Sequence, residues 1–183
     1  ISSGHLAELT KDNRNEVLDT QDAIGITDVV LAFLPPEDFA DEAAVQAAAD
    51  SLNAANEWVR ERGMKLGYHT HFWEFSSQIG SESAFARLFE LLDSDIFAEI
   101  DTYWAQVGGA NPVDVVKNFG DRAPLLHIKD GPADDPKSPM VAAGAGVIDI
   151  KGIAAVSQAD WHIVELDHCA SDMLEAVADS YTY

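Results

Sequence analysis

Two histidines, a glutamate and three large aromatic side chains lie within nine residues, in GYHTHFWEF (67–75). Imidazole and carboxylate groups placed this closely support two kinds of chemistry, proton transfer and the binding of divalent cations. His69 and His71 are two residues apart, so both lie on one face if the segment is a strand. Glu74 falls on the opposite face unless the chain turns at FWE. We therefore predict a turn there, which brings Glu74 toward the same site.

Polar residues of the same kinds end three further apolar segments. One face of each segment is apolar throughout, and the other becomes polar at its C-terminal end. The polar ends are His69 and His71 in 64–71, Asp101 in 95–101, His127 and Lys129 in 123–130, and Glu165 and Asp167 in 161–167. A single polar residue at a strand end is more often a hydrogen-bonded structural group, but four segments with matching alternation favour a site.

Active sites of parallel α/β folds form at the C-terminal ends of strands, so these side chains are predicted to converge. Nitrogen and oxygen donors without thiolates argue for a divalent cation and against a structural zinc site. The donor types leave Mn, Mg, Co, Fe and Zn open.

The elements that must position these residues follow from the alternation of short apolar runs with helical patterns, which is typical of βαβ units around a parallel sheet. Strands are expected at 1–5, 28–34, 64–71, 95–101, 123–130 and 161–167, and helices near 8–24, 41–62, 81–92, 112–119, 149–157 and 171–180. Asn111 followed by Pro112 indicates a helix start, and Gly63 and Gly120 follow the last turns of two helices. Residues 131–146 are predicted to form a loop.

Composition restricts the partners and the compartment. The formal charge of −21 arises from 32 acidic and 11 basic residues, which excludes nucleic acid and anionic membrane surfaces as expected partners. Such an acidic chain is also typical of proteins that remain soluble at high salt, and we hypothesise a halophilic origin. The single cysteine, Cys169, excludes an internal disulfide and fits a reducing cytoplasm. No secretory signal and no apolar run of about 20 residues is present.

Four segments carry a family resemblance: LGYHTHFWEF, the stretch from Glu99 to Asp130, GAGVIDI and IVELD. They resemble the xylose isomerase-like TIM-barrel superfamily, close to sugar phosphate isomerases/epimerases, inosose dehydratases and 3-keto-sugar hydratases. The resemblance covers the chain from residue 1 to its end as one domain, 1–183, and implies a (β/α)8 barrel. It also implies a divalent cation, commonly manganese, held by a Glu, Asp, His, Glu set. On this chain the set is Glu74, Asp101, His127 and Glu165, with His69 as the alternative to Glu74.

The resemblance implies an isomerase or epimerase that removes a proton beside a carbonyl of a keto-sugar, polyol or sugar phosphate through an enediolate. The base would be His69, His71 or Glu165, and substrate contacts would come from Lys129, Asp167, Trp73 and Trp104. A dehydratase with the same site and a non-catalytic partial barrel are the alternatives. Endonuclease IV, of the same superfamily, has a histidine where this chain has Trp104, so cleavage of abasic DNA is not expected.

The number of strands departs from the implied fold. A (β/α)8 barrel takes about 250 residues, whereas these 183 residues provide six strands and lack the first two β/α units. An open sheet edge is a liability in water. We therefore expect either an incompletely represented chain or a partner, such as a second copy in a homo-oligomer, that covers the gap.

Overall fold

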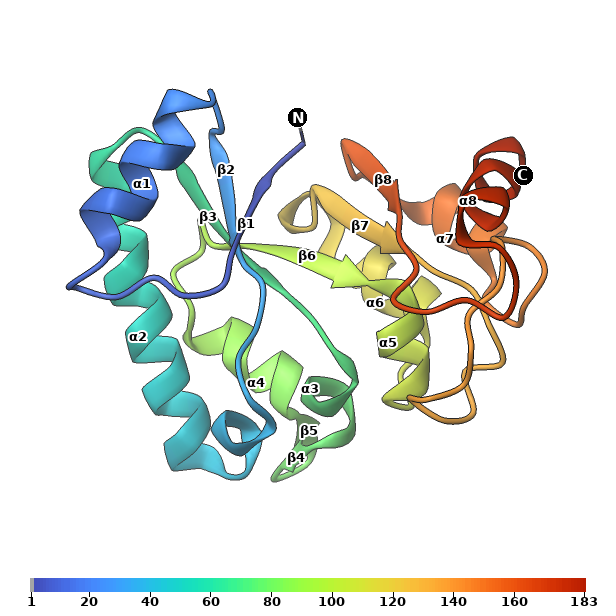
Figure 1. Cartoon of the computed structure of the whole chain (residues 1–183). Coiled ribbons are helices and arrows are strands. Elements are labelled where there is room, and N and C mark those ends of the chain that lie inside the picture. Colours follow the sequence, from blue (N-terminus) through green and yellow to red (C-terminus); the bar gives the residue numbers. More distant parts are fainter. Residues whose placement is uncertain (1) are drawn as a thin grey trace. The chain divides into compact units, whose positions relative to one another are not determined.

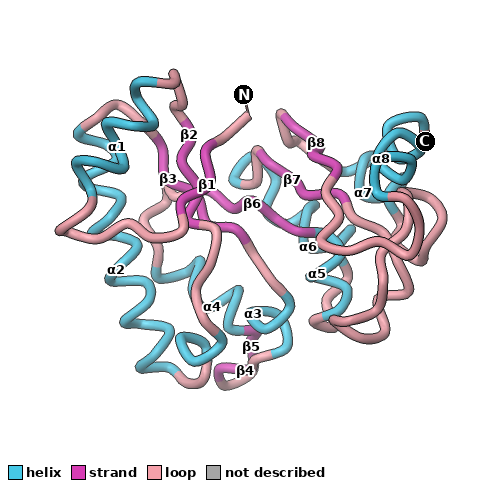
Figure 2. Tube along the Cα trace, viewed as in Figure 1, coloured by secondary structure: helices cyan, strands magenta, loops and turns pink. Residues whose placement is uncertain are grey.

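The computed structural model describes residues 2–183 and contains all six predicted strands in one sheet (Figures 1 and 2). The strands are β1 (Gly4–Leu6), β2 (Asp28–Leu31), β3 (Lys65–His69), β6 (Phe97–Asp101), β7 (Leu125–Ile128) and β8 (Trp161–Val164). Their order along the sheet is β1-β2-β3-β6-β7-β8, and the recorded pairings are parallel. Parallel strands alternating with helices confirm the predicted fold class, a partial (β/α)8 barrel.

The helices also follow the predicted order, and short ones are added at the strand ends. They are α1 (Arg14–Ala23), α2 (Glu42–Glu61), α3 (Phe72–Ser76), α4 (Ala84–Leu91), α5 (Thr102–Val107), α6 (Pro112–Phe119), α7 (Ile150–Val156) and α8 (Met173–Thr182), with 3₁₀ turns η1 (Pro36–Phe39) and η2 (Gly120–Arg122). A two-stranded hairpin, β4 (Gln78–Ile79) and β5 (Glu82–Ser83), precedes α4. Among residues 2–183, no helix combines the length and the apolar character needed to cross a membrane.

Two compact units divide the chain between Glu99 and Ile100. In the first unit, α2 begins at Asp41, whose side chain accepts a hydrogen bond from the backbone N–H of Ala44 at 2.9 Å. The buried residues of α2 recur at helical spacing and pack against β3, α4 and η1. They are Val45, Ala48, Ala49, Leu52, Ala55, Asn56 and Val59. This packing fixes β3, which carries His69.

Gly67 lies at the centre of β3, opposite Phe97 in the pairing of β3 with β6. A Cβ at this position would overlap the Phe97 ring, so only glycine allows the ring to lie over the strand. Phe97 is buried, and its ring fills the space over Gly67 that a side chain at position 67 would take.

Gly67→Ala is expected to lower the free energy of unfolding by about 1–3 kcal/mol, since overpacking forces the Phe97 ring or the strand to shift. Urea unfolding measures the loss. The double variant with Phe97→Leu is the control, because the smaller side chain should recover part of the lost stability. Additive effects of the two substitutions would contradict the overlap.

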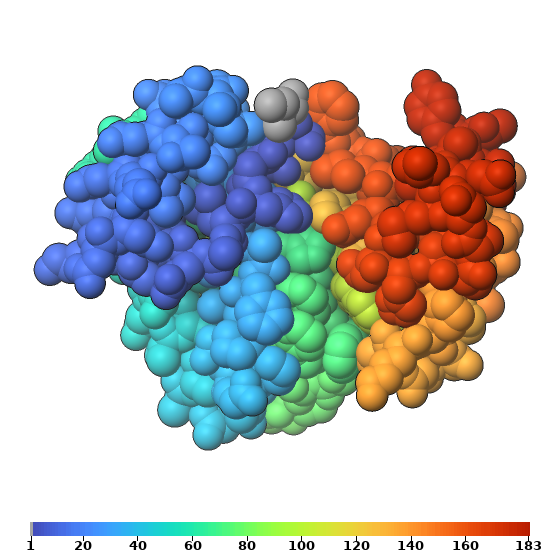
Figure 3. Space-filling model, viewed as in Figure 1, coloured from blue at the N-terminus to red at the C-terminus, as the bar shows by residue number. Residues whose placement is uncertain are grey.

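In the second unit, polar side chains begin each helix. Asn111 caps α6 through the backbone N–H groups of Val113 and Asp114, with Pro112 in the first helical position, as the sequence predicts. Asp149 and Asp172 cap α7 and α8 in the same way. Helix α8, red in Figure 3, lies at the surface with its residue Leu174 largely exposed.

The segment 131–146 lacks helices and extended strands, as predicted, and it is organised by Asp130. This carboxylate is buried and accepts hydrogen bonds from four backbone N–H groups. The donors belong to Gly131, Gly144, Gly146 and Ile148. The loop that follows β7 is therefore tied directly to the end of that strand.

Candidate functional site

A cluster of charged side chains lies at the C-terminal ends of β6, β7 and β8 in the second unit. Lys129 Nζ is 2.9 Å from a carboxylate oxygen of Asp101, of Glu165 and of Asp167. His127 Nδ1 is 2.6 Å from Glu165 Oε2. Lys129 and Asp101 are buried, whereas Glu165 and Asp167 are about 40% exposed. The structure thus brings together five residues that the alternation of faces selects.

Opposite charges in this cluster shift the pKa values of Lys129 and Glu165 in the directions that favour their charged forms. Burial alone would lower the pKa of Lys129, but the negative charges of Asp101, Glu165 and Asp167 raise it above its usual value. Burial would raise the pKa of Glu165, but the hydrogen bond from His127 and the charge of Lys129 hold it well below its usual range. Three carboxylates and one ammonium give the cluster a net formal charge of −2, which favours a divalent cation.

The two carboxylate oxygens of Asp101 have different partners: one caps a helix and the other belongs to the charged cluster. Oδ1 accepts hydrogen bonds from the backbone N–H groups of Tyr103 at 3.0 Å and Trp104 at 2.9 Å, and so begins α5. Oδ2 is the oxygen that contacts Lys129. Helix α5 therefore orients the carboxylate, as outer contacts orient metal ligands in known sites.

Three of the four predicted metal ligands belong to this cluster. Asp101, His127 and Glu165 each offer a ligand atom, and these atoms lie within 4.8 Å of one another. One imidazole and two carboxylates suit Mn, Fe, Co, Zn or Mg. The donor set therefore fits the divalent cation that the sequence predicts.

Glu74 has a different environment in the first unit. The chain turns into α3 at FWE, as predicted, and Glu74 is fully buried. Its Oε1 accepts the hydroxyl hydrogen of Tyr68, and its Oε2 accepts the backbone N–H of His71 at 3.0 Å. Burial and the charge of Glu74 raise the pKa of Tyr68 well above its usual value. Glu74 belongs to no close group of three metal-ligating side chains among residues 2–183, and its role as a ligand stays a prediction.

The two predicted histidines have separate partners, and only His69 lies on a strand. The strand predicted over 64–71 ends at His69, because the chain turns there and His71 becomes the N-cap of α3. His69 Nδ1 is 3.0 Å from Glu99 Oε2, an oxygen that His5 Nε2 also contacts. The His71 ring stacks on Trp73 with centroids 4.3 Å apart and an angle of 8° between the planes. His5 and Glu99 are not among the predicted site residues, although Glu99 shares a strand face with Asp101.

The two tryptophans predicted to contact substrate lie beside the polar residues. Trp73 stacks on His71 and also meets the edge of Phe33. Trp104, mostly buried, has its ring centroid 5.6 Å from Lys129 Nζ, within reach of a cation–π interaction.

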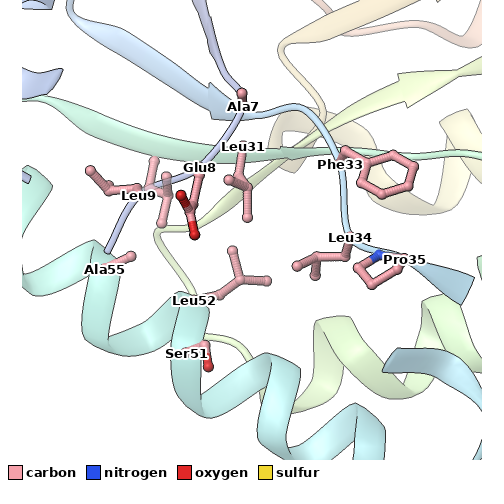
Figure 4. Close-up of a pocket in the computed structure, with 11 residues that line it drawn as sticks. Ala7, Glu8, Leu9, Leu31, Phe33, Leu34, Pro35, Ser51, Leu52 and Ala55 are labelled. Atoms are coloured by element: carbon pink, nitrogen blue, oxygen red, sulfur yellow. The ribbon is translucent and has the colours of Figure 1, made fainter. Parts of the chain in front are cut away.

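A separate pocket of about 470 Å³ in the first unit is lined by none of the predicted site residues (Figure 4). Its lining is mostly apolar, with Leu31, Phe33, Leu34 and Leu52 around it and Glu8 as its charged side chain. The pocket lacks the convergent polar groups of a catalytic site. The charged strand ends remain the candidate site.

Parallel strands, intervening helices and a polar site at the strand ends define an α/β-barrel protein. Residues 7–165 match the family described as xylose isomerase-like TIM barrel, and the chain belongs to that family.

An inosose dehydratase from Geobacillus kaustophilus (strain HTA426) is 33% identical over 86 residues, which are 46% of this chain and 27% of that protein. The aligned segment therefore spans less than a third of the length of this curated relative. A sugar phosphate isomerase/epimerase from Parabacteroides distasonis ATCC 8503 superimposes with a TM-score of 0.77 at 25% identity, covering 100% of this chain and 69% of its own. The IOLI protein with a zinc atom superimposes with a TM-score of 0.64 at 16% identity, covering 97% of this chain and 71% of its own.

Proposed function

We propose that the chain belongs to a divalent-metal-dependent isomerase or epimerase that acts on a keto-sugar, polyol or sugar phosphate. The observation that carries the proposal is the convergence of Asp101, His127 and Glu165 at the ends of β6, β7 and β8. The likeness to a sugar phosphate isomerase/epimerase supports the substrate class, and zinc in the IOLI structure agrees with a divalent cation.

Asp101, His127 and Glu165 would hold the cation, which supplies positive charge to stabilise the negative charge of an enediolate. Lys129 supplies a positive charge to the three carboxylates around it and offers N–H donors to a substrate hydroxyl or phosphate. Glu165 and Asp167 are partly exposed, so a substrate can replace one of these carboxylates as the partner of an N–H group of Lys129.

The low pKa of Glu165 indicates whether this residue acts as a metal ligand or as a base. A carboxylate held well below its usual pKa accepts a proton weakly at neutral pH, so Glu165 suits a ligand better than a base. His71 is the better base on accessibility, since its side chain is 18% exposed and that of His69 is 7% exposed. Stacking on Trp73 fixes the orientation of the His71 ring.

A dehydratase is the second candidate, and the likeness to an inosose dehydratase favours it. The same residues would remove the proton beside the carbonyl, and loss of a β-hydroxyl would follow in place of proton return. The two reactions share their first step. Exchange of the substrate C–H with solvent deuterium therefore tests both.

Metal content and deuterium exchange on keto-sugars, inososes and sugar phosphates test the proposal. His127→Ala should lower both metal content and exchange, whereas His71→Ala should keep the metal and reduce exchange by about 100-fold or more. His162→Ala is the control, because His162 is exposed and bonds Ser157. Stoichiometric metal without exchange on any substrate would favour a non-catalytic partial barrel, and metal retained in His127→Ala would remove the assigned site.

A further inference from the structure

The apolar pocket of the first unit has the size of a small-molecule site (Figure 4). Its volume of about 470 Å³ lies in the usual range for such pockets, about 300–1,000 Å³. Three segments enclose most of it: residues 7–9 after β1, residues at and after the end of β2, and one face of α2. None of its lining residues belongs to the set proposed to hold the metal ion, so a molecule bound here would be a second ligand of the chain.

Small side chains on α2 leave this space open. Ser51 and Ala55 lie one helical turn apart, so both face the pocket on either side of Leu52. A larger side chain at Ala55 would extend into the space. The opposite wall is stiff, because Pro35 lines it and Pro36 follows, and both rings fix the backbone φ angle. Walls that are already ordered lower the entropy cost of binding a ligand.

A single carboxylate sets the charge of the pocket. Among the described residues that line it, Glu8 alone is charged, and no lysine or arginine lies with it. The side chain of Glu8 projects toward Leu52 in Figure 4, and its carboxylate has no ion pair or hydrogen bond with any residue of 2–183. An unpaired carboxylate favours a cationic ligand, and the net charge of −21 adds to the attraction.

The other polar side chain of the lining is already bonded. The hydroxyl of Ser51 donates a hydrogen bond to the backbone carbonyl of Ala47 at 3.0 Å. Glu8 is therefore the side chain that offers a polar contact to a ligand. An ammonium group suits it, because hydrogen bonds between two charged groups are the strong ones. The leucines around the pocket suit an apolar body.

We propose that this pocket binds a small primary amine with an apolar body. The ammonium group lies against Glu8, and the apolar body fills the space between α2 and the segment that contains Pro35. An anion of the same shape is rejected, because its charge faces the carboxylate of Glu8. This site goes beyond the proposed function and does not depend on it, since neither the metal ion nor a sugar takes part in the binding.

Three probes of similar shape test the proposal on the full chain: 3-phenylpropylamine, 3-phenylpropanol and 3-phenylpropionate. Isothermal titration calorimetry at pH 7 and low salt should show that the amine binds about 10-fold more tightly than the alcohol, because a charge-assisted hydrogen bond adds to burial of the shared body. The propionate should bind most weakly. Added NaCl should reduce the advantage of the amine, since Glu8 is exposed and its charge is screened.

Two variants separate the carboxylate from the cavity. Glu8→Gln should lower the affinity for the amine about 10-fold, to that of the alcohol, and leave binding of the alcohol unchanged. Ala55→Leu should weaken both the amine and the alcohol, because the larger side chain fills the space. Glu57→Gln makes the same change in net charge at an exposed position of α2 outside the pocket, so it is the control and should bind all three probes as the wild type does.

Amide chemical shifts in NMR spectra of the wild type locate the bound amine, and they decide the matter if Ala55→Leu does not fold. The shifts should change at 7–9, 31–35 and 51–55. Shift changes confined to other segments would overturn the proposal, as would equal affinities for the amine and the propionate or no binding of the amine at millimolar concentration. Equal losses in Glu8→Gln and Glu57→Gln would also overturn it, because the overall charge of the chain would then explain the preference.

Discussion

Lys129→Met is expected to lower the free energy of unfolding by about 3 kcal/mol at pH 7 in the absence of divalent cations. The substitution keeps the length of the side chain and removes an ammonium that lies 2.9 Å from three carboxylates. Asp101 then keeps a fully buried negative charge without this cation. The loss lies at the lower end of the range for buried ion pairs, since Glu165 and Asp167 remain partly hydrated.

The pH at which unfolding is measured follows from the direction in which the pKa of Lys129 is shifted. The pKa of Lys129 is raised in the folded chain, so its stabilising contribution is fully present below the ordinary lysine pKa and is lost only as the pH rises through the raised value. Urea unfolding at pH 7 therefore measures the whole contribution.

A divalent cation should offset much of this loss. With the ammonium removed, Asp101 and Glu165 carry uncompensated charge that Mn²⁺ or Mg²⁺ can neutralise, and a ligand at 100 times its Kd adds about 2.7 kcal/mol. Lys117 is an exposed residue of α6, so Lys117→Met makes the same change in net charge and should stay within about 0.5 kcal/mol of wild type. Equal losses in the two variants, or no recovery with cation, would argue against the cluster as described.

The regular elements were predictable because their signals are local. Six strands and six helices follow from runs and periodicity, and the Asn111-Pro112 start of α6 follows from capping chemistry. Helices α3 and α5 have five and six residues, which is fewer than two turns, so neither shows a readable period. Asp101 caps the start of α5. Because Asp101 also ends strand β6, the sequence pattern indicates a strand end and not a helix cap.

The site was predictable where it depends on the alternation of strand faces. That rule selects His127 with Lys129 and Glu165 with Asp167, and the structure joins them. The contact between His5 and Glu99 spans 94 residues and depends on the order of the strands, which short segments do not reveal. The hydrogen bond from Tyr68 to Glu74 likewise depends on how α3 turns, and local spacing predicts the turn but not the partner.

The loop after β7 should depend on one carboxylate. Asp130 is 1% exposed, with Oδ1 accepting from Gly131 at 2.8 Å and Ile148 at 3.0 Å. Its Oδ2 accepts from Gly144 at 2.8 Å and Gly146 at 3.0 Å. Gly144 has a positive φ of 85°, and a Cβ at Gly146 would overlap the carboxylate, so the glycines of GAGVID let the backbone close around Asp130.

Asp130→Ala is therefore expected to cost about 3 kcal/mol, because four backbone donors lose a charged acceptor and the loop admits water only by opening. Asp130→Asn should give a smaller loss, since its carbonyl oxygen still accepts on one side while its NH₂ group faces two N–H donors. Asp134→Ala is the control within the same loop, as Asp134 is exposed and bonds Ser138.

Urea unfolding gives the energies, and amide hydrogen exchange should show lost protection at 144–148. His127 lies on β7, and Lys129 lies between the end of that strand and Asp130. Opening of the loop should therefore also weaken metal binding by the second unit. Unchanged exchange in Asp130→Ala would mean that the loop holds its form through other contacts.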